Sequence, residues 1–201
     1  MRYARRLVLA FGAATIMFGT RVRAADGIGH AVRTAGAPVL QRAESVLDLR
    51  PRDAVFEGDI VRTDGRSLAE LMLAGATRIN LGLNTEFEID SFTADLGGEV
   101  SLGGAMVFDR PEDLPPIDLT VRSAFARIGV RGTRFFAGPS NGVFAVFVAR
   151  GSVEVRSSDG GSARILGPGE GVDIDRAGGR PGPVVRWGQP RIDAAFASVG
   201  L

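Results

Sequence analysis

The chain has 201 residues, enough for one domain with a complete hydrophobic core. It contains no cysteine, which excludes disulfides, thiolate metal sites, a thiol nucleophile and a lipid-modified cysteine anchor. Its 24 basic residues, all arginine, nearly balance its 23 acidic residues, so the formal net charge is +1.

Residues 1–24 have the three parts of an export signal. Three arginines precede the apolar run 7–18, and a small residue, Ala24, follows it. The run is shorter than the roughly 20 residues of a membrane-spanning helix, so we expect cleavage after Ala24 and a periplasmic or secreted protein. The general and the twin-arginine export routes both stay open. Cleavage leaves 19 basic residues against 23 acidic ones, and a mildly acidic mature chain argues against nucleic acid as a partner.

Short apolar segments between Gly- and Pro-containing turns dominate the rest of the chain. The predicted strands alternate apolar and polar residues or are apolar throughout, and they are 54–62, 67–73, 77–83, 85–89, 99–108, 118–128, 143–148, 151–156, 163–166 and 172–174. Long amphipathic helices are missing from the sequence, which excludes a βαβ nucleotide-binding architecture. We therefore predict an all-β fold, a sandwich or a β-roll of short antiparallel strands, with a short C-terminal helix or tail.

Two connections and one strand have a distinct composition. Residues 109–116 (DRPEDLPP) must run over the surface, because proline offers no backbone donor to a sheet. Residues 143–148 (VFAVFV) are apolar on both faces, which suits a central strand. Gly- and Pro-rich residues 178–183 read as a linker, and 192–199 have the spacing of a short helix. The expected organisation is a lead-in over 25–53, a β domain over 54–175, and a linker and tail over 176–201.

The segment 126–135, ARIGVRGTRF, is the most distinctive in the chain. Ile128 and Val130 alternate with more polar neighbours, which indicates one buried and one exposed face. Gly129 and Gly132 are typical of a β-bulge or of a close approach between strands. In the same structural interpretation Thr133 bonds a turn backbone through its hydroxyl and Phe135 enters the core.

This motif resembles the FecR-type periplasmic domain, in which an apolar-Gly-Val-Arg-Gly-Thr sequence leads into an aromatic residue. VFEGDIVRTDGRSLAELML upstream and FAVFVARGSVEVRSSDGGSARILGPGEGVDI downstream are similar to the family's pattern, so the likeness covers residues 54–174. The resemblance implies an exported β-rich domain that works by protein contact. In the best-understood architecture such a domain follows a cytoplasmic anti-sigma segment and a membrane helix. Here we expect a stand-alone version without those two parts.

The functional hypothesis is a non-catalytic binding module, a protein–protein scaffold or signalling adaptor whose partner is a cell-envelope or outer-membrane component. The candidate binding residues are those of the motif and its exposed face: Arg127, Gly129, Arg131, Gly132, Thr133 and Arg134. Arg131 and Arg134 would form a recognition pair for a partner carboxylate. A phosphate-binding loop is disfavoured, since no helix follows the motif. The alternative function is cell-wall or polysaccharide binding, which would need a row of exposed aromatics.

Catalysis is not expected, and neither are a metal or a cofactor. The single histidine, His30, lies in a segment expected to fray, so a hydroxyl–His–Asp arrangement has no base. Glu57 with Asp59 are two apart on a strand, but such acids beside a turn are usually solvated surface. We expect Trp187 in the tail to dock on the domain rather than to serve as a ligand platform. Oligomeric state and docking of the tail are open.

Overall fold

Strands and one short helix account for most of residues 27–94 and 96–201, which are the residues that the structure, a computed structural model, describes. The predicted export signal, residues 1–24, lies outside them. The elements are β1 (Gly29–Ala35), β2 (Val39–Arg42), β3 (Ser45–Asp48), β4 (Ala54–Val55), β5 (Ile60–Arg62), β6 (Leu68–Leu73), β7 (Thr77–Leu81), β8 (Glu86–Thr93), β9 (Gly97–Gly103), β10 (Met106–Asp109), β11 (Asp118–Ser123), β12 (Ala126–Ser140), β13 (Val143–Ser157), β14 (Ala163–Leu166), β15 (Glu170–Ile174), β16 (Val185–Arg186) and α1 (Gln189–Ala197).

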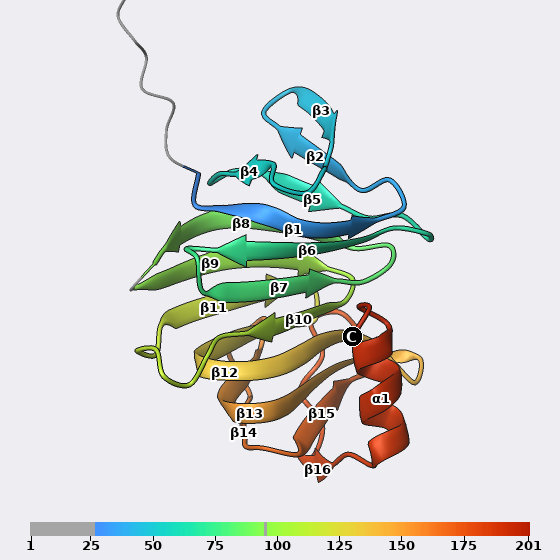
Figure 1. The fold of residues 1–201 in the computed structure, drawn as a ribbon. Helices are drawn as coiled ribbons and strands as arrows, with labels where there is room; N and C mark the ends of the chain where they lie inside the picture. Colours follow the sequence, from blue (N-terminus) through green and yellow to red (C-terminus); the bar gives the residue numbers. More distant parts are fainter. Residues whose placement is uncertain (1–26, 95) are drawn as a thin grey trace, which may run out of the picture.

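The strands form one continuous sheet that folds over on itself into two layers (Figure 1). Layer A has the strand order β3-β2-β5-β8-β9-β11, and layer B has the order β4-β1-β6-β7-β10. The long strands β12 and β13 join the layers. One half of β12 pairs with β11 of layer A and the other half with β10 of layer B. Strand β13 pairs along β12, and β14 extends layer A from its second half while β15 extends layer B from its first half. The prediction of an all-β fold with a short C-terminal helix is confirmed.

The hydrophobic core fills the space between the two layers. Along the long strands, every second side chain points toward the other layer, as expected for a sheet with one face turned inward. Phe87 from layer A, Phe108 from layer B and Phe135 from the joining strand β12 are fully buried, and the rings of Phe108 and Phe135 stack with centroids 5.5 Å apart. The expected core role of Phe135 is therefore confirmed.

Strand β12 passes from one layer to the other at the Val-Arg-Gly-Thr motif. Residues 126–131 pair with β13 in one register, and this register shifts between Arg131 and Arg134. Before the shift β12 pairs with β11 of layer A, and after it with β10 of layer B. The motif glycine Gly132 thus lies in a β-bulge inside a continuous strand, as the sequence suggested.

The C-terminal segment docks on the outer face of layer B. Phe136, Phe147 and Val107 point outward from the sheet there and form a second apolar cluster with Trp187 and residues of α1. This covering explains why 143–148 are apolar on both faces. Helix α1 begins at Gln189, three residues before the predicted start, with a proline in its first turn, where a missing N–H costs nothing.

Two expectations from the sequence are wrong. The segment around His30 does not fray, because β1 pairs with β6 along its length and also with β4. Asp59 is not solvated surface: its side chain is 1% exposed and bonds Nε and Nη2 of Arg42 at 2.8 and 2.7 Å. This contact raises the pKa of Arg42, chiefly through the hydrogen bond to Asp59.

The predicted surface connection between β10 and β11 lies as expected outside the sheet, over residues 110–117. Arg110 is nevertheless buried beneath it, donating through Nε to the carbonyl oxygen of Pro115 at 3.0 Å and through Nη1 to Oγ1 of Thr77 at 3.1 Å. The connection is therefore fixed to the sheet. Neither α1 nor any other helix among the described residues has the length and apolarity needed to cross a membrane.

Candidate binding face

The outer face of layer A carries the exposed side chains of the first half of the motif. Arg122 of β11, Arg127 of β12 and Arg156 of β13 lie opposite one another in consecutive ladder pairs. Paired residues point to the same side of a sheet, so these three exposed arginines form one row across three strands. We call this row the arginine row.

Arg127, the central arginine of the row, differs from its two neighbours in its ion-pair partners. Arg122 bonds Glu99 at 2.7 Å, and Arg156 pairs with Glu154 on its own strand. For Arg127, residues 27–94 and 96–201 provide no carboxylate within ion-pair distance. Like charges placed directly opposite in a sheet repel each other. The guanidinium of Arg127 is thus exposed, flanked by positive charge and available to an external anion.

Gly129 opens a gap beside Arg127. It lies two residues further along β12, on the same face, between Thr120 and Glu154. A Cβ placed on Gly129 would have Glu154 atoms as its nearest neighbours, at 4.0 Å. The predicted close approach of a neighbouring strand is therefore wrong for Gly129. Its effect is to leave the sheet surface bare next to the arginine row.

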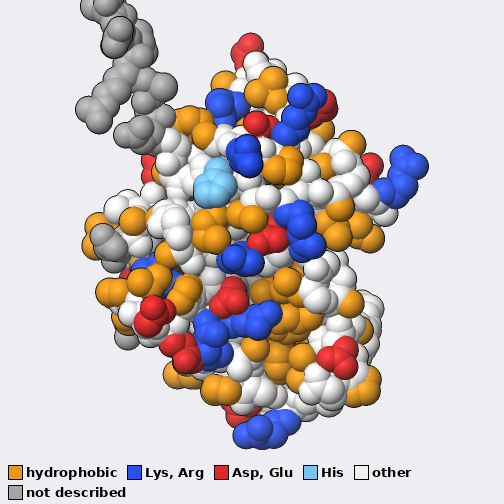
Figure 2. All heavy atoms as spheres, in the orientation of Figure 1, with side chains coloured by type: hydrophobic (Ala, Val, Ile, Leu, Met, Phe, Trp, Pro, Cys, Tyr) orange, Lys and Arg blue, Asp and Glu red, His pale blue; other side chains and the backbone are white. Residues whose placement is uncertain are grey.

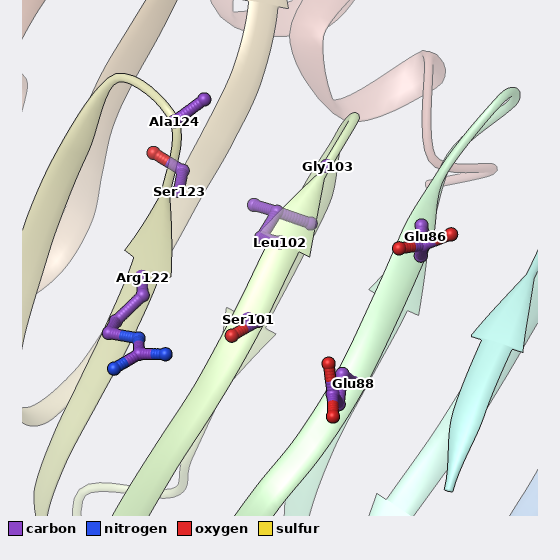
Figure 3. Close-up of a pocket in the computed structure, with 8 residues that line it drawn as sticks. All are labelled: Glu86, Glu88, Ser101, Leu102, Gly103, Arg122, Ser123 and Ala124. Atoms are coloured by element: carbon purple, nitrogen blue, oxygen red, sulfur yellow. The ribbon is translucent and has the colours of Figure 1, made fainter. Parts of the chain in front are cut away.

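A groove runs over β9 on the other side of the arginine row (Figure 3). It has a volume of about 330 Å³. Ser101 and Gly103 give it a floor of small residues, while Glu86 and Glu88 rise on one side and Arg122 on the other. The exposed face of layer A is thus acidic over β8 and basic over β11 to β13.

Thr133, in the second half of the motif, makes its contacts inside the molecule. The Thr133 hydroxyl is fully buried and donates to the carbonyl oxygen of Arg150 across the bulge. Thr133 thus bonds backbone through its hydroxyl, but the acceptor lies in strand β13 and not in the turn that the sequence suggested. The same residue accepts at its carbonyl from the backbone N–H of Arg110, 3.1 Å away, so the bulge also holds the Pro-rich connection.

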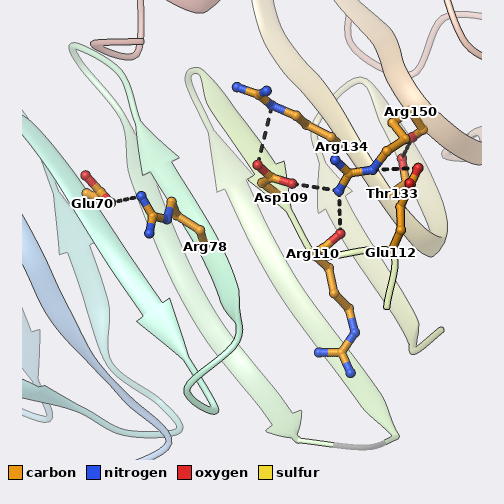
Figure 4. A network of polar contacts seen from close by, with 8 residues as sticks. All are labelled: Glu70, Arg78, Asp109, Arg110, Glu112, Thr133, Arg134 and Arg150. Carbon is orange, nitrogen blue, oxygen red and sulfur yellow. Dashed lines mark hydrogen bonds and ion pairs between the residues drawn. The ribbon is translucent and has the colours of Figure 1, made fainter. Parts of the chain in front are cut away.

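Arg134 lies on layer B, away from the arginine row. Its Nε is 3.5 Å from Oδ2 of Asp109, and its guanidinium lies 5.1 Å from the ring centroid of Phe196 in α1. Asp109 also bonds Arg150 at 2.9 Å, and Arg150 reaches Glu112 at 3.1 Å (Figure 4). Arg134 is therefore committed to contacts within the chain.

The expected recognition pair of Arg131 and Arg134 is separated by the bulge. The backbone of Arg131 is still paired with Asp118 of layer A, whereas Arg134 is already paired with Asp109 of layer B. Of the four candidate residues whose exposure the structure describes, Arg127 and Gly129 lie on the outer face of layer A and Thr133 and Arg134 do not. Sequence reasoning missed Arg122 and Arg156, whose position beside Arg127 depends on strand pairing.

On the outer face of layer B, by contrast, the charged side chains form ion pairs with one another. Figure 2 shows arginine and acidic side chains side by side across it. Glu70 is within 3.0 Å of Arg78 and 3.3 Å of Arg33, and a cleft of about 690 Å³ lies between Arg78 and Arg150. These charges neutralise one another within the chain, so this face offers less to an external ion than the arginine row does.

The side chains that the sequence analysis considered for catalysis or ligand binding make contacts within the chain. Glu57 accepts the backbone N–H of Phe92 at 2.9 Å. Trp187 is 8% exposed and stacks on Phe147. Within residues 27–94 and 96–201, groups of three or more His, Asp or Glu placed to hold a metal ion do not occur.

Comparisons with known proteins agree with this architecture. Residues 59–154 match the family described as FecR protein. Two crystal structures of a candidate anti-sigma factor from Parabacteroides distasonis, at 1.65 and 2.50 Å resolution, have a similar fold, each with a TM-score of 0.54 and 23% identity. Each alignment covers 68% of this chain, but 64% and 63% of the respective relatives. A search of curated proteins gave no match.

Proposed function

We propose that the protein is an exported, non-catalytic FecR-type module that binds a protein partner in the periplasm, as a signalling adaptor or scaffold. One observation carries the proposal. The outer face of layer B is covered by Trp187 and α1, whereas the outer face of layer A, which bears the exposed half of the family motif, is uncovered in the described chain. A bare charged sheet face with a central unpaired arginine suits recognition of another protein.

The comparisons support the signalling part of the proposal. The family match covers both the motif and the strands that build the arginine row up to Glu154. The structurally similar Parabacteroides protein is described as a candidate anti-sigma factor, which is a regulatory role exercised by protein contact. We propose residues 54–175 as the FecR-like unit, with strands of 27–53 paired to it and 176–201 docked on it.

Photo-crosslinking in intact cells tests the partner. Probes replace Thr120 and Ser152, which flank the arginine row on layer A, and a control probe replaces Arg186, which is exposed in β16. The expected result is the same discrete protein captured from both layer A probes and not from Arg186. Capture of glycan fragments instead would favour the cell-wall alternative. Capture no stronger than at Arg186 would overturn the proposal.

Export is tested separately. The N-terminus of the protein recovered from a periplasmic fraction should be Ala25, as measured by intact mass. Recovery of the full-length chain from the cytoplasm would contradict the periplasmic part of the proposal and leave the binding face untouched.

A further inference from the structure

We infer that the arginine row binds an extended acidic segment of the partner, with carboxylates two residues apart that meet Arg127 and one of its neighbours. The inference rests on the proposed function, since it names the chemistry of the contact on the same face. It goes further in choosing Arg127 as the central contact.

The spacing of the row fits such a segment. Neighbouring strands lie about 4.8 Å apart, so the three arginines span roughly 10 Å from β11 to β13. In an extended chain, side chains on the same side repeat about every 7 Å. Two carboxylates of that spacing come within reach of the flexible arginine side chains. Arginine holds a carboxylate through two parallel N–H bonds, which favours a carboxylate over a less directional anion.

The neighbouring acids argue against a polyanion. Glu99 and Glu154 lie in the next rank of paired residues on the same face, where they bond Arg122 and Arg156, and Glu86 and Glu88 line the groove beside the row. A nucleic acid or an anionic surface would bring negative charge over all of these carboxylates at once and be repelled. A short acidic segment needs to place only two carboxylates, one over Arg127 and one over a neighbouring arginine.

Two local features favour a polypeptide. The bare surface at Gly129 allows a backbone to approach the sheet closely beside Arg127. Ile165 of β14 is 73% exposed and lies on the same face, paired with Glu154 at the margin of the row. Apolar and arginine side chains together are typical of the residues that dominate protein interfaces.

The test measures binding of two fluorescent octapeptides to the purified mature chain by anisotropy. One peptide alternates threonine with glutamate, and the other alternates threonine with glutamine. The glutamate peptide should bind and the glutamine peptide should bind at least about tenfold more weakly. Arg127→Gln should weaken the glutamate peptide by about threefold to tenfold, and added salt should weaken it as well.

Glu88→Gln is the matched control, because Glu88 is a half-buried residue of the same exposed face. Removing its negative charge should leave binding of the glutamate peptide equal or tighter. Equal binding of the two peptides, wild-type affinity in Arg127→Gln, or an equal loss in Glu88→Gln would each overturn the inference.

The crosslinking experiment distinguishes this failure from failure of the proposed function. If the probe at Thr120 captures the same protein with and without Arg127→Gln, the binding function stands and the acidic contact is wrong. If the wild-type chain captures nothing above the Arg186 control, the function itself is wrong. A loss of capture in Arg127→Gln, with normal capture in Glu88→Gln, supports both.

Discussion

The ring of Trp187 stacks on the ring of Phe147, with centroids 4.9 Å apart and an angle of 21° between the planes. The guanidinium of Arg191 lies on the ring of Trp187, 3.8 Å from its centroid. Trp187 thus fixes the C-terminal segment to layer B, and Gly171 makes room for it. A Cβ on Gly171 would lie 2.2 Å from the indole nitrogen of Trp187.

Gly171→Ala should therefore displace Trp187 and loosen the C-terminal segment. Trp187 is the one tryptophan in the chain, so its fluorescence emission reports the docking directly. We expect a red shift of the emission and a loss of about 1–3 kcal/mol in the free energy of unfolding. Gly103→Ala is the control, because its Cβ would meet its nearest atom at 3.9 Å. An unshifted emission in Gly171→Ala would contradict the role of Trp187.

The hydroxyl of Thr133 is expected to stabilise the bulge. Thr133→Val keeps the shape of the side chain but removes the donor to the carbonyl oxygen of Arg150. A buried carbonyl without its partner costs about 1–3 kcal/mol, and urea unfolding should show a loss of that size. Thr120→Val, on the half-buried outer face, should change stability by less than about 0.5 kcal/mol. Equal effects in the two variants would sink this account of Thr133.

The two motif glycines should respond differently to replacement. Gly129 has open space around it and no positive φ, so Gly129→Ala should leave the melting temperature within about 2 °C of wild type. Gly132 lies within the bulge where the register of β12 shifts, and Gly132→Val should lower the melting temperature by several degrees. A melting curve for Gly132→Val that overlays the wild type would show that the bulge accepts any residue there.

The strands and the core were predictable because their pattern is local. The alternation of apolar residues identified β6, β7 and β8 directly, and Phe135 as a core residue. Strand β1 was missed because Ala31 is its one fully buried residue, so its period-2 signal is weak, and it is held by pairing with β6 far along the chain.

The candidate site was predicted only in part, for a reason that lies in strand pairing. The motif indicated exposed arginines, but a bulge changes which side chains point outward and here also coincides with the passage between layers. No local pattern shows that Arg127 and Arg134 belong to different layers. Nor does it show that Arg122 and Arg156 flank Arg127, because those contacts join three separate strands.

Acid should weaken the turn between β5 and β6 through Asp64. Its carboxylate accepts from Oγ of Ser67 at 2.7 Å and from the backbone N–H of Arg66 at 2.9 Å. The hydrogen bond from Ser67, followed by that from Arg66, lowers the pKa of Asp64. A carboxyl whose folded-state pKa is lowered stabilises the fold above its ordinary pKa of about 4, and this contribution disappears as the pH falls through the lowered value.

The melting temperature of Asp64→Asn should therefore lie below that of the wild type at pH 7, and the gap should close as the pH falls below about 4. Ser67→Ala removes the strongest donor and should move the Asp64 pKa, measured by NMR titration of its carboxyl carbon, up toward the ordinary value. Asp64 is fully exposed, so the gap should also be small. A gap that stays the same between neutral and acidic pH would mean that the charge of Asp64 contributes nothing to this turn.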